Sequence, residues 1–282
     1  MKPQLILKLA IGLFIFNSCN QSTQNDTEEH SQVEVQEEVT NNTKTELTRD
    51  PRNIGPDKPE SQHIIEENIA KINAEEDMLF GCWVGFFGEN NNKINIALAI
   101  VDGDSIFGHS VCAGNFRSIK GTIEIKEADV YSINMMEPGD NKYDGEFQFE
   151  IDVNKKELIG TWKPYKQNVL EKENYTYTLY RRDFVYDESA GDYPEGSEDL
   201  LEPMDVENLL PEEIELIRNE IYARHGYSFT NLKMRRHFDP KEWYIPMSID
   251  IRDQLTGAEA HNIDMLYNYE DYYEEYYNDF GR

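Results

Sequence analysis

The sequence has few basic residues for its length. Lys and Arg number 27 against 55 Asp and Glu, which gives a formal net charge of −28. Nucleic-acid binding without sequence preference needs Lys and Arg to replace the counterions of the phosphates, and docking on an anionic membrane by charge needs the same side chains. The composition therefore argues against a nucleic-acid partner and against membrane attachment by charge alone.

Hydrophobic residues are also scarce, at 39% of the chain, which is low for a single globular unit. A chain of 282 residues is long enough for about two domains. We therefore expect part of the chain to be unfolded and the aromatic-rich remainder to hold the core.

The N-terminal residues have the pattern of an export signal. Two lysines precede the apolar run Leu9–Phe16, which is too short to span a bilayer and has the length of a signal-peptide core. The run leads into Asn17-Ser18-Cys19, which resembles a bacterial lipobox. The resemblance implies a signal peptide of residues 1–18 and a lipid anchor, with acyl chains such as palmitate, on Cys19. An ordinary secretory signal with an incidental cysteine, or an uncleaved anchor, is the alternative.

Residues 19–60 have almost no aliphatic periodicity. Gln, Asn, Thr and Glu dominate, and Pro51, Pro56 and Pro59 close the segment. Such a polar, acidic segment cannot bury enough apolar surface to offset its ordering entropy. We predict a flexible tether that holds the protein in the cell envelope, on the periplasmic face of the outer membrane or at the cell surface.

From Phe80 to Phe184 apolar residues recur with a period of two, and turn residues punctuate the series. About eight such segments follow one another without a helix-length segment between them, which predicts an antiparallel up-and-down barrel or sandwich. The expected strands are Phe80–Phe87, Lys93–Ile100, Ser105–Cys112, Phe116–Ile125, Val130–Met135, Gly145–Ile151, Glu157–Trp162 and Tyr175–Tyr180. Ahead of them, Ser61 can cap a short helix.

Gly81-Cys82-Trp83 near the start of this series, with Arg181 or Arg182 after its last segment, resembles the closure of a lipocalin-type (calycin) barrel. In that family a late arginine covers a tryptophan at the barrel base. The resemblance implies a barrel that can hold one small apolar ligand. A plain β core, filled by its own side chains, is the alternative.

With Cys19 lipidated, Cys82 and Cys112 are the two remaining cysteines. Outside the cytoplasm two thiols in one small domain can form a disulfide, and two separate buried thiols are the alternative. The sequence contains neither a Cys-x-x-Cys nor a His-Glu-x-x-His spacing. We therefore expect no metal site and no cofactor.

The C-terminal part has helical periodicity. Pro211 suits the first turn of a helix in which Ile217, Ile221 and His225 share one face, and Gly226 ends this helix. Two further helices are predicted after it. Their expected caps are Thr230 for the first and a capping box of Thr256 and Glu259 for the second.

The run Tyr222-Ala223-Arg224-His225-Gly226, followed by Phe229, Phe238 and Trp243-Tyr244, resembles the YARHG domain family. The resemblance extends from about Leu200 to Tyr269. It implies an extracytoplasmic bacterial module and no known reaction or ligand.

Basic residues cluster around this motif, with six of them against two acids between Arg218 and Lys241. One interpretation is an anion site in which Arg224 and Arg235 or Arg236 bind a carboxylate or phosphate and His225 assists. The other is structural, with the same side chains stabilising a helix end or pairing with acids such as Glu220. The candidate ligand-binding residues are Arg218, Tyr222, Arg224, His225, Lys233, Arg235 and Arg236.

The sequence thus predicts an α+β protein, a non-catalytic cell-envelope lipoprotein whose YARHG module binds peptidoglycan, another anionic polymer or a protein partner. A carrier of a small apolar ligand is the second hypothesis, favoured by an empty barrel, and an envelope hydrolase is the third. The expected parts are a signal peptide 1–18, a tether 19–60, a β domain 61–184, a linker 185–200, a YARHG domain 201–270 and an acidic tyrosine-rich tail 271–282.

Overall fold

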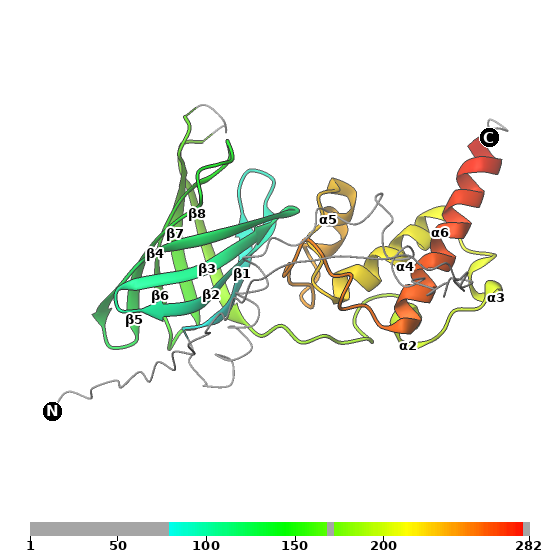
Figure 1. Ribbon diagram of the computed structural model, residues 1–282, viewed down its shortest axis with the longest axis horizontal. Helices are drawn as coiled ribbons and strands as arrows, with labels where there is room; N and C mark the ends of the chain where they lie inside the picture. The colour runs from blue at the N-terminus through cyan, green and yellow to red at the C-terminus, as the bar shows by residue number, and fades with distance from the viewer. Residues whose placement is uncertain (1–78, 168–171, 279–282) are drawn as a thin grey trace, which may run out of the picture. The chain divides into compact units, whose positions relative to one another are not determined.

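The computed structural model describes residues 79–167 and 172–278 (Figure 1). The predicted signal peptide, Cys19, the tether and the helix expected after Ser61 lie outside the described residues. Within these two ranges, no helix is both long and apolar enough to cross a membrane.

Eight antiparallel strands form a closed barrel in which each strand pairs with the next in sequence and β1 pairs with β8 (Figure 1). The strands are β1 (Gly81–Phe87), β2 (Asn92–Asp102), β3 (Ser105–Cys112), β4 (Asn115–Glu127), β5 (Val130–Met136), β6 (Gly145–Asp152), β7 (Glu157–Pro164) and β8 (Tyr175–Arg182). The predicted α+β class and antiparallel β domain are confirmed, as a barrel rather than a sandwich.

Apolar side chains fill the barrel interior. In β6, Phe147, Phe149 and Ile151 are buried and alternate with more exposed residues, as the period of two predicts. They pack with residues of the other strands, among them Trp83, Ile96, Leu98, Ile106, Ile133, Leu158 and Leu179. The interior is therefore a packed core.

One end of the barrel is closed around Trp83, whose side chain is fully buried and whose Nε1 donates to the Leu79 carbonyl at 3.1 Å. Arg181 is opposite Trp83 in the register of β1 and β8. The Arg181 guanidinium also lies against Gly81, where a Cβ atom would come within 2.5 Å of Nη2. This arrangement is consistent with the calycin-like resemblance.

Of the two alternatives for Cys82 and Cys112, the structure has two separate thiols and not the disulfide. Cys112 in β3 is opposite Ile94 in β2, and Ile94 is opposite Gly85, three residues along β1 from Cys82. Neighbouring strands lie about 4.8 Å apart, so the intervening strand alone separates the two cysteines by about 10 Å, and the three-residue offset along β1 increases this distance. Both distances exceed the roughly 7 Å that a disulfide spans.

The C-terminal helices are α2 (Glu195–Glu198), α3 (Pro203–Val206), α4 (Pro211–Arg224), α5 (Leu232–Phe238) and α6 (Gly257–Asn278). The longer two, α4 and α6, pack side by side (Figure 1). Their shared apolar core includes Ile214, Ile217, Ile221, Phe229, Phe238, Tyr244, Ile263 and Leu266.

Two of the predicted helix caps can be compared with the structure. The Thr256–Glu259 capping box is present, with Thr256 N donating to Glu259 Oε2 at 2.9 Å and Glu259 N to Thr256 Oγ1 at 3.1 Å. The predicted cap of α5 is off by one residue. Asn231, and not Thr230, accepts the Lys233 amide at 2.8 Å.

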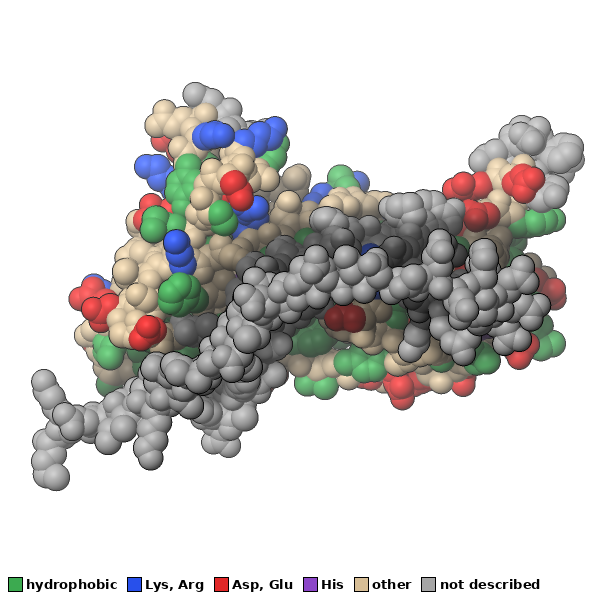
Figure 2. All heavy atoms as spheres, viewed as in Figure 1, with side chains coloured by type: hydrophobic (Ala, Val, Ile, Leu, Met, Phe, Trp, Pro, Cys, Tyr) green, Lys and Arg blue, Asp and Glu red, His purple; other side chains and the backbone are tan. Residues whose placement is uncertain are grey.

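Residues 271–278 of the predicted tail continue α6. Acidic side chains, including Asp271, Glu274 and Glu275, are exposed towards the end of this helix (Figure 2).

Hydrogen bonds also join the barrel to the helical part of the chain. Gly114 N donates to Ser228 Oγ at 2.9 Å, and Lys93 N donates to Asp239 Oδ2 at 3.0 Å.

Candidate functional site

The Tyr-Ala-Arg-His-Gly motif lies at the C-terminal end of α4, and its side chains are buried. Tyr222, Ala223 and Arg224 are the last three residues of the helix, and His225 is its C-cap. Tyr222 packs in the apolar core beside Tyr227. The three polar members of the motif therefore need partners inside the protein.

Arg224 makes four hydrogen bonds within the protein. Nη2 pairs with Glu220 Oε1 at 2.7 Å and donates to the Tyr193 carbonyl at 2.7 Å, Nε donates to the Ala190 carbonyl at 2.7 Å, and Nη1 donates to Ser197 Oγ at 3.0 Å. Burial lowers the pKa of Arg224, and the Glu220 carboxylate opposes this effect. The guanidinium is thus occupied by internal acceptors and is not open to an external anion.

His225 is bound to a buried carboxylate of α6. Its Nε2 lies 2.8 Å from Glu259 Oε2, and its ring stacks on Tyr186 with centroids 4.6 Å apart. Glu259 Oε1 also accepts from Ser197 Oγ at 2.7 Å and from the Tyr186 hydroxyl at 3.1 Å. Burial opposes ionisation of Glu259, but the hydrogen bonds from His225, Thr256 and Ser197 outweigh it and lower the pKa to about 2.

Arg218, about one helical turn before the motif, is also paired. Its Nη2 lies 2.9 Å from Glu270 Oε1 of α6, and its guanidinium lies over the Tyr267 ring, 4.3 Å from the centroid. Burial acts to lower the pKa of Arg218, but the charges of Tyr267 and Glu270 outweigh it and raise the pKa. Arg218 therefore joins α4 to α6.

Gly226 reverses the chain after α4. Its φ is +74°, and its carbonyl accepts from Met247 N at 2.7 Å and Ser248 N at 3.1 Å. A Cβ atom at this position would meet the Ile245 carbonyl at 2.8 Å. A left-handed conformation and this close backbone contact explain why glycine follows His225.

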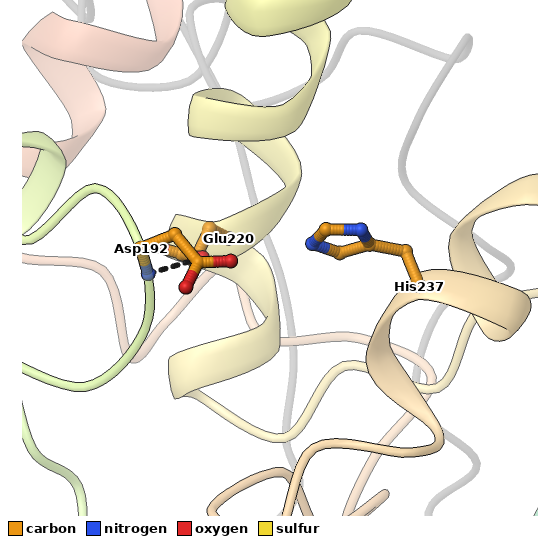
Figure 3. Close-up of side chains that lie close together, drawn as sticks. All are labelled: Asp192, Glu220 and His237. Carbon is orange, nitrogen blue, oxygen red and sulfur yellow. Dashed lines mark hydrogen bonds between the residues drawn. The ribbon is translucent and has the colours of Figure 1, made fainter.

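A further cluster consists of Asp192, Glu220 and His237, and it joins α4 to α5. Figure 3 shows His237 of α5 pointing towards the carboxylates of Asp192 and Glu220, and one ligand atom from each residue lies within 4.8 Å of the others. Each carboxylate already has a cation, since Glu220 pairs with Arg224 at 2.7 Å and Asp192 with Lys241 at 2.6 Å. Burial and the nearby Lys241 lower the pKa of His237. The cluster is therefore explained as two ion pairs beside a neutral imidazole.

Residues 192–271 match the YARHG domain family. The C-terminal region carries a YARHG domain. Neither the curated proteins nor the solved structures contain a match to the chain. The match begins at Asp192, before the predicted start at residue 201, and so includes Tyr193 and Ser197, which bind Arg224.

The remaining basic candidates of the YARHG domain lie on α5. Lys233 is exposed and pairs with Glu215, and Arg236 is exposed. Arg235 is half-buried, and its Nε is buried without a hydrogen-bond partner among the described residues. Of the seven predicted ligand-binding residues, Arg218, Tyr222, Arg224 and His225 are engaged in internal contacts. Arg224 also borders a cavity of about 610 Å³ beside Tyr186 and Trp243, but its side chain is fully buried, and Arg235 borders a second cavity.

That cavity, which we call the barrel-end cleft, has a volume of about 470 Å³. It lies at the end of the barrel opposite Trp83, where the β1–β2, β3–β4 and β5–β6 connections meet. Its lining includes Phe87, Glu89, Arg117, Glu137, Asp144, Phe147, Trp162, Tyr175 and, from α5, Arg235. Aromatic, acidic and basic side chains therefore meet in one concave space.

The aromatic wall of the cleft consists of rings that pack against one another. The Phe87 ring lies 5.6 Å from Trp162 in an edge-to-face arrangement and 6.0 Å from Tyr175. Phe147 lies 6.3 Å from both Phe87 and Trp162. Such contacts hold the rings of the aromatic wall in place.

Glu137, directly after β5, is the most buried carboxylate of this wall apart from Asp144. Its Oε2 accepts from Gly145 N at 2.6 Å and from Trp162 Nε1 at 3.1 Å. Burial raises the pKa of Glu137 to about 7, and the two hydrogen bonds oppose this effect. Sequence reasoning did not identify this residue, because a glutamate at a strand end has no distinguishing pattern.

Proposed function

We propose that the protein is a non-catalytic binding lipoprotein of the bacterial cell envelope, anchored through Cys19. It binds an anionic group of an envelope component, such as a carboxylate of a peptidoglycan stem peptide, in the barrel-end cleft. Arg235 of the YARHG domain is the residue that holds this anion.

The observation that carries the proposal is the buried, unpartnered Nε of Arg235 beside a cleft of about 470 Å³. A buried guanidinium N–H without an acceptor is costly, and a ligand carboxylate or phosphate supplies that acceptor. The volume lies in the range of pockets that hold small ligands. The cleft therefore suits one end group of a polymer or a released fragment of it.

The motif residues support a scaffold role for the rest of the domain. Arg224 is bound to Glu220 and His225 to Glu259, so an external anion would have to break a buried ion pair at Arg224 and a buried hydrogen bond at His225 to reach them. Removing one partner of a buried ion pair costs about 3–5 kcal/mol. The anion site is therefore placed at Arg235 alone.

We propose that the motif region is not catalytic on the basis of its best candidate nucleophile, Ser228. Ser228 Oγ accepts a hydrogen bond from Gly114 N at 2.9 Å, and His225 is engaged by Glu259 at 2.8 Å. Nucleophilic catalysis needs the base within hydrogen-bond reach of the nucleophile. The two side chains have separate partners and serve structural roles.

A carrier of a small apolar ligand is less well supported. The barrel interior is filled by its own side chains, and the cleft at its end carries five charged residues besides its aromatic rings. Burying these charges under an apolar ligand would cost several kcal/mol. The ligand is therefore expected to be polar at its ends.

The test measures binding of the folded, lipid-free mature chain to soluble peptidoglycan fragments by calorimetry. Arg235→Gln is expected to weaken binding by about tenfold or more, because a charge-assisted hydrogen bond contributes about 1.5–3 kcal/mol. Arg236→Gln, at the exposed neighbouring position on α5, is the matched control and should bind as the wild type does. Equal affinity of both variants would contradict the proposal.

The anchor is tested separately. Cys19→Ser should move the protein from the membrane fraction to the soluble extracytoplasmic fraction, because the thiol that accepts the lipid is removed. Retention of this variant in the membrane fraction would exclude the lipid anchor without affecting the ligand proposal.

A further inference from the structure

We infer that the barrel-end cleft binds a zwitterion, a free amino acid or short peptide whose ammonium group is held by Glu137 while its carboxylate is held by Arg235. This inference rests on the proposed function for the Arg235 half of the site. The Glu137 half is a separate assignment, with its own observations.

Glu89 at the rim of the cleft is exposed and accepts a hydrogen bond from the Tyr175 hydroxyl. The other four charged residues of the cleft fall into two groups. Arg117 pairs with Asp144 at 2.5 Å and with Asp140, and Asp144 also accepts the Gly139 and Asn141 amides. The pair of Arg117 and Asp144 is neutral in charge, and the exposed Asp140 adds one negative charge outside the cleft lining. Arg117 and Asp144 therefore already have partners, and neither needs an external ion.

Glu137 differs from these residues because its hydrogen-bond donors are both neutral. Among the described residues it forms no ion pair, although Arg117 lies close enough to act on it electrostatically. Its backbone carbonyl is held by the Tyr165 hydroxyl at 3.0 Å, and its amide by the Gly145 carbonyl at 3.1 Å. The carboxylate is thus fixed in position and lacks a cation.

Arg235 is the complementary case, a cation whose buried Nε has no acceptor. Both Glu137 and Arg235 act electrostatically on the Cys112 thiol, which also lines the cleft. A carboxylate and a guanidinium thus border the same space, neither of them in an ion pair among the described residues, although Asp239 lies close enough to Arg235 to act on it electrostatically. A molecule with an ammonium at one end and a carboxylate at the other would satisfy both.

The aromatic wall favours the same class of ligand. Ammonium groups are attracted to the faces of tryptophan, tyrosine and phenylalanine rings, and Trp162 donates directly to Glu137. The apolar rings also provide a surface for the side chain between the two charged ends. A volume of about 470 Å³ accommodates a short peptide and excludes a folded chain.

Burial raises the pKa of Glu137 to about 7, so its ionised fraction in the empty cleft increases as pH rises through 7. The charged groups that act on it are Asp144, which favours protonation, and Arg117, which opposes it. Binding of an ammonium needs the ionised form. Affinity for a zwitterion is therefore expected to increase between pH 6 and pH 8.

The test uses calorimetry with a panel of dipeptides of the form Ala-Xaa at pH 8, followed by the N-acetyl and C-terminal amide derivatives of those that bind. We expect the free dipeptide to bind about tenfold or more tightly than either derivative. Glu137→Gln should weaken dipeptide binding and remove its increase between pH 6 and pH 8. Glu150→Gln, at an exposed position on β6, is the matched control and should change neither.

The outcomes separate the two proposals. If the N-acetyl derivative binds as tightly as the free dipeptide, or if no dipeptide binds while peptidoglycan fragments do, the ammonium site at Glu137 is wrong and the anion site stands. If the amide binds as tightly as the free dipeptide, the carboxylate site at Arg235 is wrong, and the proposed function fails with it.

Discussion

Glu259 combines two roles that are usually divided between residues. As the N3 residue of a capping box, it accepts a hydrogen bond from the Thr256 amide at the start of α6. The same carboxylate accepts from Ser197 and Tyr186 and binds His225. A single buried anion therefore fixes the start of one helix against the end of another and against the segment that precedes α2.

Arg224 is predicted to contribute strongly to stability. Arg224→Ala would leave the fully buried Glu220 carboxylate without its cation, at a cost of about 3–5 kcal/mol. Urea unfolding of the wild type and the variant measures this loss. Arg236→Ala, an exposed arginine twelve positions along the chain, should change the free energy of unfolding by less than about 0.5 kcal/mol. Similar losses for both arginines would contradict the structural role.

His109 predicts a pH dependence of stability. Both ring nitrogens are buried without hydrogen-bond partners among the described residues, and burial lowers the pKa of this histidine to about 3. The unfolded chain takes up a proton below its ordinary pKa of about 6.5 while the folded chain does not, so stability falls as pH falls from about 6.5 towards 3.

His109→Phe removes this titration and keeps the ring that stacks on Phe116, 4.6 Å away. Between pH 7.5 and pH 5, the free energy of unfolding of the variant relative to wild type should rise by about 2 kcal/mol. His261→Gln, on the exposed side of α6, should leave that difference unchanged. Chemical denaturation at the two pH values checks both.

The contacts of the candidate site residues were only partly predictable from the sequence. Arg224 and Glu220 are four positions apart on a helix, which is the spacing of an ion pair, and the structural interpretation named this acid. Glu259 is 34 residues from His225, and its capping-box pattern gave no indication of a second partner. Glu137 and Arg235 meet only because the fold brings distant segments to one cleft.

At the scale of elements, the strands were predictable because alternation sets which face is buried. Gly145–Ile151 and Glu157–Trp162 were expected, and β6 and β7 extend them by one and two residues. Each hairpin then fixes the register with its neighbour. The closing pair of β1 and β8 has no local signal, which is why a sandwich was an equal alternative.

The segment 185–200 shows where composition is a poor guide. Its glycine, proline and acidic residues predicted a linker, yet Ala190 and Tyr193 supply backbone carbonyls to Arg224, and Ser197 is buried between Arg224 and Glu259. Backbone acceptors have no sequence signature. A buried arginine with more donors than nearby acids is the one indication that such carbonyls must exist.

The turn after α4 gives an element-level prediction. Gly226→Ala places a Cβ atom 2.8 Å from the Ile245 carbonyl at a φ of +74°, and should destabilise the protein by about 1–3 kcal/mol. Gly257→Ala, at the start of α6 with open space around it, is the control and should be neutral or stabilising by up to about 1 kcal/mol. Thermal unfolding measures both. An equal effect of the two substitutions would remove the special role of Gly226.

At the scale of the whole molecule, the free thiols of Cys82 and Cys112 give a direct prediction. The protein should show no loss of two hydrogens in an intact mass measured without reductant, because the two residues lie on strands separated by β2. After unfolding, both thiols should react with a maleimide. A mass lower by two hydrogens, or failure of both thiols to react, would contradict this arrangement.

The order of strands in the barrel has a consequence for how the chain matures. Seven of the eight strand pairs join consecutive strands, and only the pairing of β1 with β8 joins the two ends of the domain. Contacts between residues far apart in sequence form late, because the loop between them must close first. A chain that is synthesised from its N-terminus therefore remains an open sheet, with both edges exposed, until Arg182 has emerged. During that interval the exposed edges can pair with other chains, and a stop codon placed just before β8 should yield an aggregating fragment.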